Sequence, residues 1–453
     1  KTRVKKMGLT TVDGDQWNLN QIESFLKSSS QKNWQESVSA EITALELGLP
    51  GQSSEERFQL LMRLDHKIGS VWSAINLFSL QLSEHSVDSD MEFWLIKVSR
   101  KLVDQMEEFC HSISGHNAFV PDIIRLWAEL LQVERQFTNL KNSYRDIGKG
   151  SASSSSGLLE RRQIDPEANA FHIRLKQNGL NQSSAEFTEE HANESRAYFD
   201  SLLLELGARS AWLSDIRQFE MDQFRICELD WRDALELVCS SFKFIHLLCE
   251  TYLNDIIKNQ HIRFLKEQNQ PDMCVDTPFG SFVQLYFDGS LNGLVRLVHE
   301  LGHAIHQRLH RESTMGVIPL TEVVSETWAM AFENRFLEHL RTCCPEWVAQ
   351  VDAFRGFQRI EMSNRHRMLT RFEHSLHAKQ IQNEADIDEL WLQVNHRFYG
   401  PNIHFETEFQ SAWKDVGHIF IAPFYLSVYA EAKERADLCD LSSMIQAYCS
   451  KRN

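Results

Sequence analysis

Two histidines and a glutamate lie within five consecutive positions in the second half of the chain. His299 and His303 are four positions apart, so on a helix both imidazoles project from the same face. Two imidazoles arranged in this way can hold one Zn²⁺ ion, and Glu300 beside them can take a proton from a water at that ion. The spacing predicts a zinc-dependent hydrolase. Because three fixed positions also occur by chance in unrelated proteins, the surrounding sequence has to support this interpretation.

The residues around the motif favour a helix that starts shortly before it. Residues 280–290 loosely alternate β-branched or aromatic side chains with polar ones between glycines, which is typical of a short strand. Ser290 then stands where an N-cap residue belongs, so we expect a helix from Leu291 onward. Apolar residues flank the motif at Leu294, Leu297, Val298 and Ile305. A capped helix with an apolar face makes a chance match less plausible.

A catalytic zinc site needs a third protein ligand and an open fourth position. We expect this ligand from a helix over residues 319–333, where Glu322 and Glu326 lie one turn apart on the same face. Spacing does not choose between them, and the helix dipole alone also favours an acidic first turn. His306 and His310 extend the histidine stripe, but one helix supplies no more than about two ligands to a tetrahedral ion. We expect these two histidines around the site or in solvent.

The stretch 413–429 is rich in proton donors, among them His418, Tyr425 and Tyr429. Hydroxyl and imidazole donors beside a metal can stabilise the oxyanion of a tetrahedral intermediate. Aromatic residues at this spacing are more often part of a hydrophobic core, so the pattern alone leaves both interpretations open.

Four stretches together resemble the thimet-oligopeptidase family of zinc metallopeptidases, and most of all its oligopeptidase F branch. They are SFVQLYFDGSLNGLVRLVHELGHAIHQ (281–307), TEVVSETW (321–328), FYGPNIHFETEF (398–409) and GHIFIAPFYLSVYAEA (417–432). The resemblance is strong over roughly the last 175 residues and general before them. It departs from the branch at Ser427, where a tyrosine is often found, and the chain is shorter than typical members.

The resemblance implies a role for individual residues. Glu322 would be the third zinc ligand, because it opens the E-x-x-S motif that Ser325 completes. His418, Tyr425 and Tyr429 would contact the substrate and stabilise the transition state. The strand before the zinc helix would bind the peptide backbone along its edge, through Phe282, Val283, Gln284, Leu285, Tyr286 and Phe287.

Helical periodicity dominates the chain and predicts a mainly α fold. Apolar residues recur every three or four positions from Leu235 to Ile256, which predicts one long amphipathic helix. Similar patterns run through 55–85, 91–112 and 120–142. The resemblance implies two helical halves that flank a deep substrate channel, with a small β element beside the zinc helix. We expect an N-terminal helical region over 1–200, with a Gly/Ser-rich loop at 148–157, and a catalytic domain over 201–453.

Composition excludes several other classes of protein. Asp and Glu outnumber Lys and Arg by 63 to 47, and a net charge of −16 argues against a nucleic-acid partner. The longest apolar runs are much shorter than the ~20 residues of a membrane span. Nine cysteines without regular spacing favour reduced thiols, and no apolar segment follows the basic first residues, so we expect a cytoplasmic protein without a signal peptide. The sequence does not determine the oligomeric state.

The most consistent hypothesis is a zinc-dependent endopeptidase that acts on short peptides and binds one Zn²⁺ per chain. One alternative is a helical metallocarboxypeptidase, which would need a basic pocket for the terminal carboxylate of its substrate. The other is a non-catalytic, peptide-binding protein with a vestigial zinc site, but a structural site has no use for the base Glu300.

Overall fold

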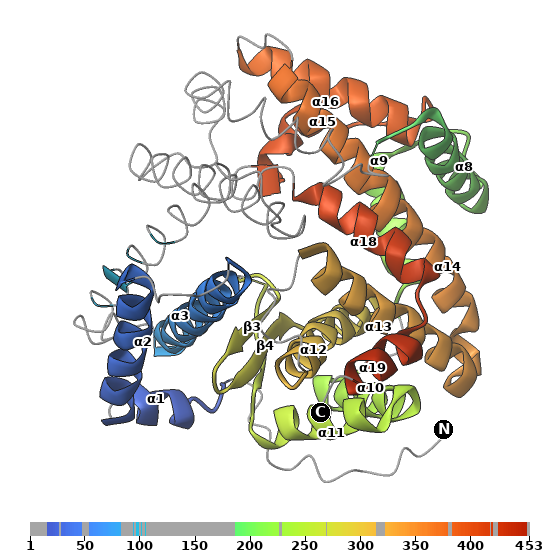
Figure 1. The fold of residues 1–453 in the computed structure, drawn as a ribbon. Helices are drawn as coiled ribbons and strands as arrows, with labels where there is room; N and C mark the ends of the chain where they lie inside the picture. Colours follow the sequence, from blue (N-terminus) through green and yellow to red (C-terminus); the bar gives the residue numbers. More distant parts are fainter. Residues whose placement is uncertain are drawn as a thin grey trace.

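A computed structural model describes most of the second half of the chain and part of the first (Figure 1). The described residues are 16–26, 29–47, 54–82, 94, 97, 98, 101, 105, 186–225, 229–268, 270–313, 322–378, 383–416, 418, 419 and 425–450. The predicted Gly/Ser-rich loop at 148–157 and the periodic segment 120–142 lie outside this set. The boundary near residue 200 stays a prediction.

The prediction of a mainly α fold is confirmed. The N-terminal helices are α1 (Asn20–Leu26), α2 (Ser29–Leu47) and α3 (Ser54–Leu82). The following helices are α8 (Glu189–Glu205), α9 (Leu213–Gln223), α10 (Trp231–Ile245), α11 (Leu247–Lys258), α12 (Leu291–Arg311) and α13 (Glu322–Cys343). The last ones are α14 (Val348–Gln358), α15 (His366–Ala378), α16 (Glu384–Tyr399), α18 (Leu426–Leu438) and α19 (Leu441–Cys449). A π-helix, η2 (Arg359–Arg365), joins α14 to α15, and 3₁₀ segments lie at η1 (Pro345–Trp347) and η3 (Thr407–Asp415). None of the helices in the described part is both long and apolar enough to cross a lipid bilayer.

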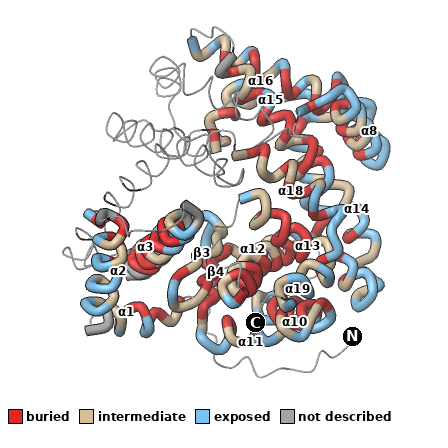
Figure 2. Tube along the Cα trace, viewed as in Figure 1, coloured by how far each residue is buried: buried red, intermediate tan, exposed pale blue. Residues whose placement is uncertain are grey.

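One hydrophobic core surrounds α12, whose sides are covered by α10, α11 and α13 (Figures 1 and 2). A three-stranded sheet lies beside α12, with strand order β2 (Ile262–Leu265), β4 (Gly280–Tyr286) and β3 (Met273–Thr277). β4 is the central strand, parallel to β2 and antiparallel to β3. Residues near the N-terminus pack on this sheet, where the Trp17 indole donates a hydrogen bond to the Val283 carbonyl over 2.9 Å. The sheet is therefore buried on the side that faces α1 and α3.

A second core joins α8, α9, α15, α16 and the start of α18 (Figure 1). Its largest side chains are aromatic, and polar groups fix two of them. The indole nitrogens of Trp391 and Trp413 donate to the Phe409 carbonyl and to the Asp388 carboxylate. A short parallel strand pair, β1 (Ala211–Trp212) with β5 (Ile403–His404), connects α9 to the segment after α16.

The continuous helix formed by α14, η2 and α15 links the two cores. Val351 and Phe354 belong to the core around α12, whereas Met368 and Phe372 belong to the second core. The π-helix lies between these contacts, and insertions of this kind often occur at functional positions. At its centre, both oxygens of the buried Glu361 carboxylate meet an arginine at 2.8 Å, from Arg217 of α9 and from Arg365.

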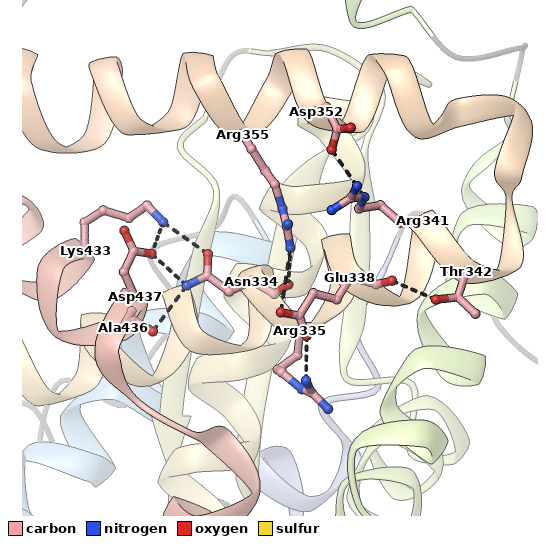
Figure 3. A network of polar contacts seen from close by, with 10 residues as sticks. All are labelled: Asn334, Arg335, Glu338, Arg341, Thr342, Asp352, Arg355, Lys433, Ala436 and Asp437. Atoms are coloured by element: carbon pink, nitrogen blue, oxygen red, sulfur yellow. Dashed lines mark hydrogen bonds and ion pairs between the residues drawn. The ribbon is translucent and has the colours of Figure 1, made fainter. Parts of the chain in front are cut away.

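Polar side chains hold α13, α14 and α18 together (Figure 3). Arg355 of α14 donates to the Asn334 carbonyl of α13, and Arg341 of α13 pairs with Asp352 over 3.3 Å. Lys433 of α18 donates to the Asn334 side chain over 3.1 Å. Because α13 and α18 carry residues of the predicted site, these contacts fix the relative positions of its two sides.

Two helices replace the single helix that the periodicity predicted between Leu235 and Ile256. α10 ends at Ile245, and His246 has an extended backbone with φ −166° and ψ 143°. Its imidazole accepts a hydrogen bond from the Leu248 amide, so His246 acts as the N-cap of α11. The apolar spacing continues across this break, which hides it from a periodicity argument.

The buried ion pair in the π-helix generates a testable prediction. Glu361→Gln should lower the free energy of unfolding by about 3 kcal/mol at pH 7, because it removes the charge of a buried carboxylate that pairs with two half-buried arginines. Burial alone would raise the pKa of Glu361, yet Arg217 and Arg365 hold it at about 2, below the ordinary value of 4.5. The wild type should therefore exceed Glu361→Gln in free energy of unfolding by the full amount above about pH 4.5. This difference should be lost as the pH falls toward 2.

Urea denaturation at several pH values measures this difference. Glu338→Gln is the matched control, because Glu338 pairs with an arginine in a half-exposed position, and it should change stability by less than about 1 kcal/mol. A Glu361→Gln effect that is equal at pH 7 and pH 3 would contradict the assignment.

Candidate metal centre

α12 presents the two histidines of the motif side by side, as their spacing predicted. The Ser290 hydroxyl caps this helix by accepting from the Gly293 amide over 2.9 Å. Its apolar face is buried against the core, which turns the histidine face toward α13. The Nε2 atoms of His299 and His303 lie 3.0 Å apart, and the ring planes are nearly perpendicular at 87°. Both nitrogens thus point to one common region.

A glycine between the two histidines allows α13 to come close. A Cβ atom at Gly302 would lie 3.1 Å from Cα of Ala329 and 3.1 Å from the Phe332 ring, which is tighter than ordinary packing. The backbones of α12 and α13 therefore meet at this point. Glutamates on the facing side of α13 are brought to the histidines as a result.

Glu326 is the carboxylate that the structure places at the two imidazoles. Its oxygens lie 3.3 Å from His299 Nε2 and 3.7 Å from His303 Nε2, and the three residues form a group that could hold a metal ion. The resemblance implied Glu322 instead, and that assignment stays a prediction. Glu322 is the exposed first residue of α13, seven positions before the contact at Ala329, or ~10 Å along the helix axis. Glu326 is only three positions before that contact and is buried.

The distances between the two imidazole nitrogens and the Glu326 carboxylate are of the size found around a tetrahedral zinc ion. Zinc bonds of about 2.0–2.2 Å at tetrahedral angles place neighbouring ligand atoms about 3.4 Å apart. The two Nε2 atoms are 3.0 Å apart, and Glu326 approaches them with one oxygen each, Oε2 at 3.3 Å from His299 and Oε1 at 3.7 Å from His303. In addition, Glu326 is buried and turns both carboxylate oxygens to the imidazoles. Two imidazoles and a carboxylate are donors that Zn²⁺ accepts, so the residues fit the ion.

Each histidine has a partner on its other ring nitrogen. His299 Nδ1 lies 2.6 Å from a carboxylate oxygen of Glu333, and His303 Nδ1 lies 3.0 Å from the Ser325 hydroxyl. Because the Glu333 carboxylate accepts, His299 carries a proton on Nδ1, and its Nε2 is the atom that faces Glu326. Partners of this kind orient metal-binding imidazoles in many proteins.

The electrostatics of the group favour charged carboxylates and at least one neutral imidazole. Burial and the neighbouring His299 lower the pKa of His303 to about 4, so this ring is neutral at pH 7. Burial alone would raise the pKa of Glu326, but its hydrogen bond to His299 lowers it. For His299, hydrogen bonds to Glu326 and Glu333 outweigh burial and raise the pKa.

Glu300 lies on the same helix as the histidines and is almost fully buried. Burial raises its pKa to about 7, and the nearby Glu326 carboxylate opposes its ionisation further. A carboxyl group that titrates near neutral pH can accept a proton in one step and return it in another. This environment suits the predicted role of a general base.

His418, Tyr425 and Tyr429 come together at the start of α18. Tyr425 and Tyr429 are one turn apart, their ring centroids lie 5.2 Å apart, and the His418 ring stacks on Tyr425 at 5.6 Å. The Tyr425 hydroxyl donates to a Glu326 oxygen over 3.2 Å. This contact brings the aromatic group to the ligand set, although the two segments are about a hundred positions apart in the sequence.

The structure does not support the predicted edge-on binding of a peptide along residues 282–287. β4 ends at Tyr286 and is the central strand of its sheet, so β2 and β3 already occupy both of its edges. Phe282 packs against Trp17 and stacks on His261 at 4.0 Å. A strand between two neighbours has no free edge for a peptide.

Of the two positions expected for His306 and His310, around the site or in solvent, the structure excludes solvent. Both are buried, and neither belongs to the metal-binding group. His306 stacks on Trp328 with centroids 4.4 Å apart, and its Nε2 lies 3.3 Å from the Tyr448 hydroxyl. They belong to the packing between α12, α13 and α19 rather than to solvent.

The sequence analysis missed Glu333, which lies seven positions after Glu326. Residues seven apart on a helix share a face, so the spacing could have identified a second carboxylate directed at α12. It also missed Gln358, whose side-chain amide donates to the other Glu333 oxygen over 2.7 Å. No local signal connects residue 358 to the motif, because only the tertiary fold brings α14 to α13.

Comparisons with known proteins give one family match and several similar structures. Residues 290–444 match Peptidase family M3, which confirms the predicted resemblance over this region. A search of curated proteins finds no match. Among solved structures, the chain is similar to a protein from Chlamydophila abortus that carries a provisional assignment as a peptidase, at 13% identity and a TM-score of 0.50, over 98% of this chain and 93% of that one. It is also similar to oligoendopeptidase-F from Enterococcus faecium, at 14% identity and a TM-score of 0.41, over 93% and 89% of the two chains. At such identities, the likeness to the Chlamydophila abortus protein concerns the fold.

A pair of variants decides between the two glutamates of α13. Glu326→Ala should remove most of the zinc, because it deletes the carboxylate nearest both imidazoles, whereas Glu322→Ala should retain at least half an equivalent. Elemental analysis of protein purified without added metal gives the content of each variant. The reverse outcome would assign the ligand to Glu322, as the E-x-x-S motif implies, and would require α13 to shift by one turn.

Proposed function

We propose that this chain, which matches peptidase family M3 over residues 290–444, is a zinc-dependent endopeptidase that cleaves short peptides. The family match supports a peptidase in general. The observation that carries the finer proposal is the position of His299, His303 and Glu326 at separations that suit zinc, next to a carboxyl group whose pKa is about 7. His299, His303 and Glu326 would hold the ion.

A bound Zn²⁺ would supply Lewis-acid chemistry, which polarises a carbonyl and acidifies water. Glu300 takes a proton from the attacking water while the oxygen of that water forms a bond to the carbonyl carbon of the scissile peptide bond. The carboxyl group then delivers this proton to the amine that leaves. Burial raises the pKa of Glu300 to about 7, so the residue can exchange a proton in both directions at neutral pH.

The aromatic group at α18 would supply hydrogen-bond donors to the developing oxyanion. Burial, together with the negative charge of Glu326, raises the pKa values of Tyr425 and Tyr429 above the ordinary range of a phenol. Both hydroxyls therefore stay protonated. Burial lowers the pKa of His418, so its ring is a neutral donor. Donors positioned in advance stabilise charge that appears only in the transition state.

The substrate backbone would pair with β3 rather than with β4. β3 lies at an edge of the sheet, and it contacts the zinc helix where the Cys274 thiol donates to the Gln307 side chain over 3.4 Å. Burial raises the pKa of Cys274, and so does the charge of Glu300, which supports a position of this strand near the base. An extended peptide added to a sheet edge gains main-chain hydrogen bonds without regard to its sequence.

We also propose that a channel between the two halves admits short peptides. We further propose that the protein is located in the cytoplasm. The two hydrophobic cores on either side of the π-helix support two halves, and the unpaired cysteines of the described residues agree with a reducing compartment. The proposal involves neither nucleic acid nor a membrane as partner.

A length series of one peptide sequence tests the proposed substrate class. The ratio kcat/KM should peak at about five to fifteen residues, since an extended chain rises by at most ~3.3–3.6 Å per residue and a channel a few tens of ångströms deep holds no more. Casein should be a poor substrate, and a chelator should abolish cleavage of every peptide until zinc is restored. Equal rates on casein and on the best peptide would exclude an enclosing channel, and full activity in chelator would exclude metal dependence.

Glu300→Gln separates catalysis from metal binding. The amide cannot accept the proton, so kcat should fall by about 10²–10⁴-fold while zinc content and fold stay unchanged. Glu338→Gln on α13 is the control, because it removes a carboxylate outside the site, and it should keep full activity. If Glu300→Gln retains most of the rate, another group is the base.

A further inference from the structure

A buried chain of hydrogen bonds leads from the metal centre to the helix that links the two cores. It starts at His299 Nδ1, which lies 2.6 Å from Glu333 Oε1. Glu333 Oε2 in turn accepts from Gln358 Nε2 over 2.7 Å. Glu333 is 4% exposed and Gln358 is 5% exposed, so water does not compete for either contact. The three residues come from α12, α13 and α14.

Each oxygen of the Glu333 carboxylate has one donor, on opposite sides of the group. The donor on one side is the imidazole of His299, and the donor on the other is the amide of Gln358. Rotation of the carboxylate would break both bonds in a buried region, where each unpaired polar group carries a desolvation penalty. The orientation of the carboxylate therefore depends on Gln358, and the orientation of His299 depends on the carboxylate.

The position of Gln358 in the fold adds to this argument. It is the last residue of α14, and the π-helix starts at the next position. α14 is tied to α13 by the contacts of Arg355 and Asp352, which lie within six residues before it (Figure 3). The amide of Gln358 thus comes from a segment that is held in place independently of the metal centre.

We propose that Glu333 and Gln358 are positioning residues of the metal centre, with Gln358 acting through Glu333 to keep the proton of His299 on Nδ1 and its Nε2 directed at the ion. This inference rests on the proposed zinc site. Neither residue belongs to the group of potential ligands. A purely structural role would predict that their loss changes only stability, whereas a positioning role predicts weaker zinc binding in protein that is still folded.

A set of four variants tests the proposal. Glu333→Leu removes the acceptor of His299, Glu333→Gln keeps an acceptor without the charge, and Gln358→Leu removes the donor of Glu333 at similar volume. The double variant Glu333→Leu/Gln358→Leu tests whether the two act in series. Glu338→Gln, on the exposed part of α13, is the matched control.

Zinc affinity is measured by competition with a chelating indicator, at a temperature where circular dichroism shows each variant folded. Glu333→Leu should weaken zinc binding by about 10–100-fold, Glu333→Gln by less, and Gln358→Leu by about 3–10-fold, whereas the control should match the wild type. The double variant should bind zinc no more weakly than Glu333→Leu alone, because Gln358 has no route to His299 except through Glu333. Replacement of zinc by Co²⁺ gives a second readout, since its visible spectrum reports the ligand geometry and should change in Glu333→Leu and Gln358→Leu.

Several results would overturn the inference. Wild-type affinity and an unchanged Co²⁺ spectrum in Gln358→Leu would remove Gln358 from the positioning pair, and additive losses in the double variant would exclude action in series. If Glu333→Leu does not fold, Gln358→Leu and Glu333→Gln still decide between the roles. A wild type that binds no zinc would instead refute the proposed function, so the two failures are distinguishable.

Discussion

Helices α12 and α13 meet at Gly302, where even a methyl group would press against the Ala329 backbone. This close approach determines which side chains of α13 reach the histidines. Glu326 lies one turn before the contact and Glu333 one turn after it, so the two carboxylates reach the histidine face from both sides of the crossing. A larger residue at position 302 would push the helices apart and separate the three ligands, although it would leave every ligand in the sequence.

The same contact concentrates charge in a region with little water. Glu326 and Glu333 lie beside two imidazoles, of which His303 has a pKa lowered to about 4 by burial. Buried carboxylates are costly unless a positive group or a hydrogen-bond donor compensates them. The donors are Gln358, Tyr425 and the histidine nitrogens, and a divalent cation suits the remaining negative charge. Glu300, which has the least compensation among these acids, is the one whose pKa rises to about 7.

The parts of this arrangement that are local could be predicted from the sequence, and the parts that depend on packing could not. The spacing of His299 and His303 determines their common face on any helix, and Ser290 marks where that helix begins. Glu322 and Glu326 share a face as well, so only the position of the interhelical contact distinguishes them. β3 joins β4 through the two residues 278 and 279, whereas β2 comes before both strands. The strand pattern of 280–290, taken alone, does not reveal that both of its edges are paired.

Anomalous X-ray scattering on either side of the zinc absorption edge, from crystals grown without added metal, tests the central claim most directly. The account predicts one peak per chain, with His299 Nε2, His303 Nε2 and a Glu326 oxygen each about 2.0–2.2 Å away. A peak ligated by other residues, or no peak in protein that cleaves peptides, would contradict it.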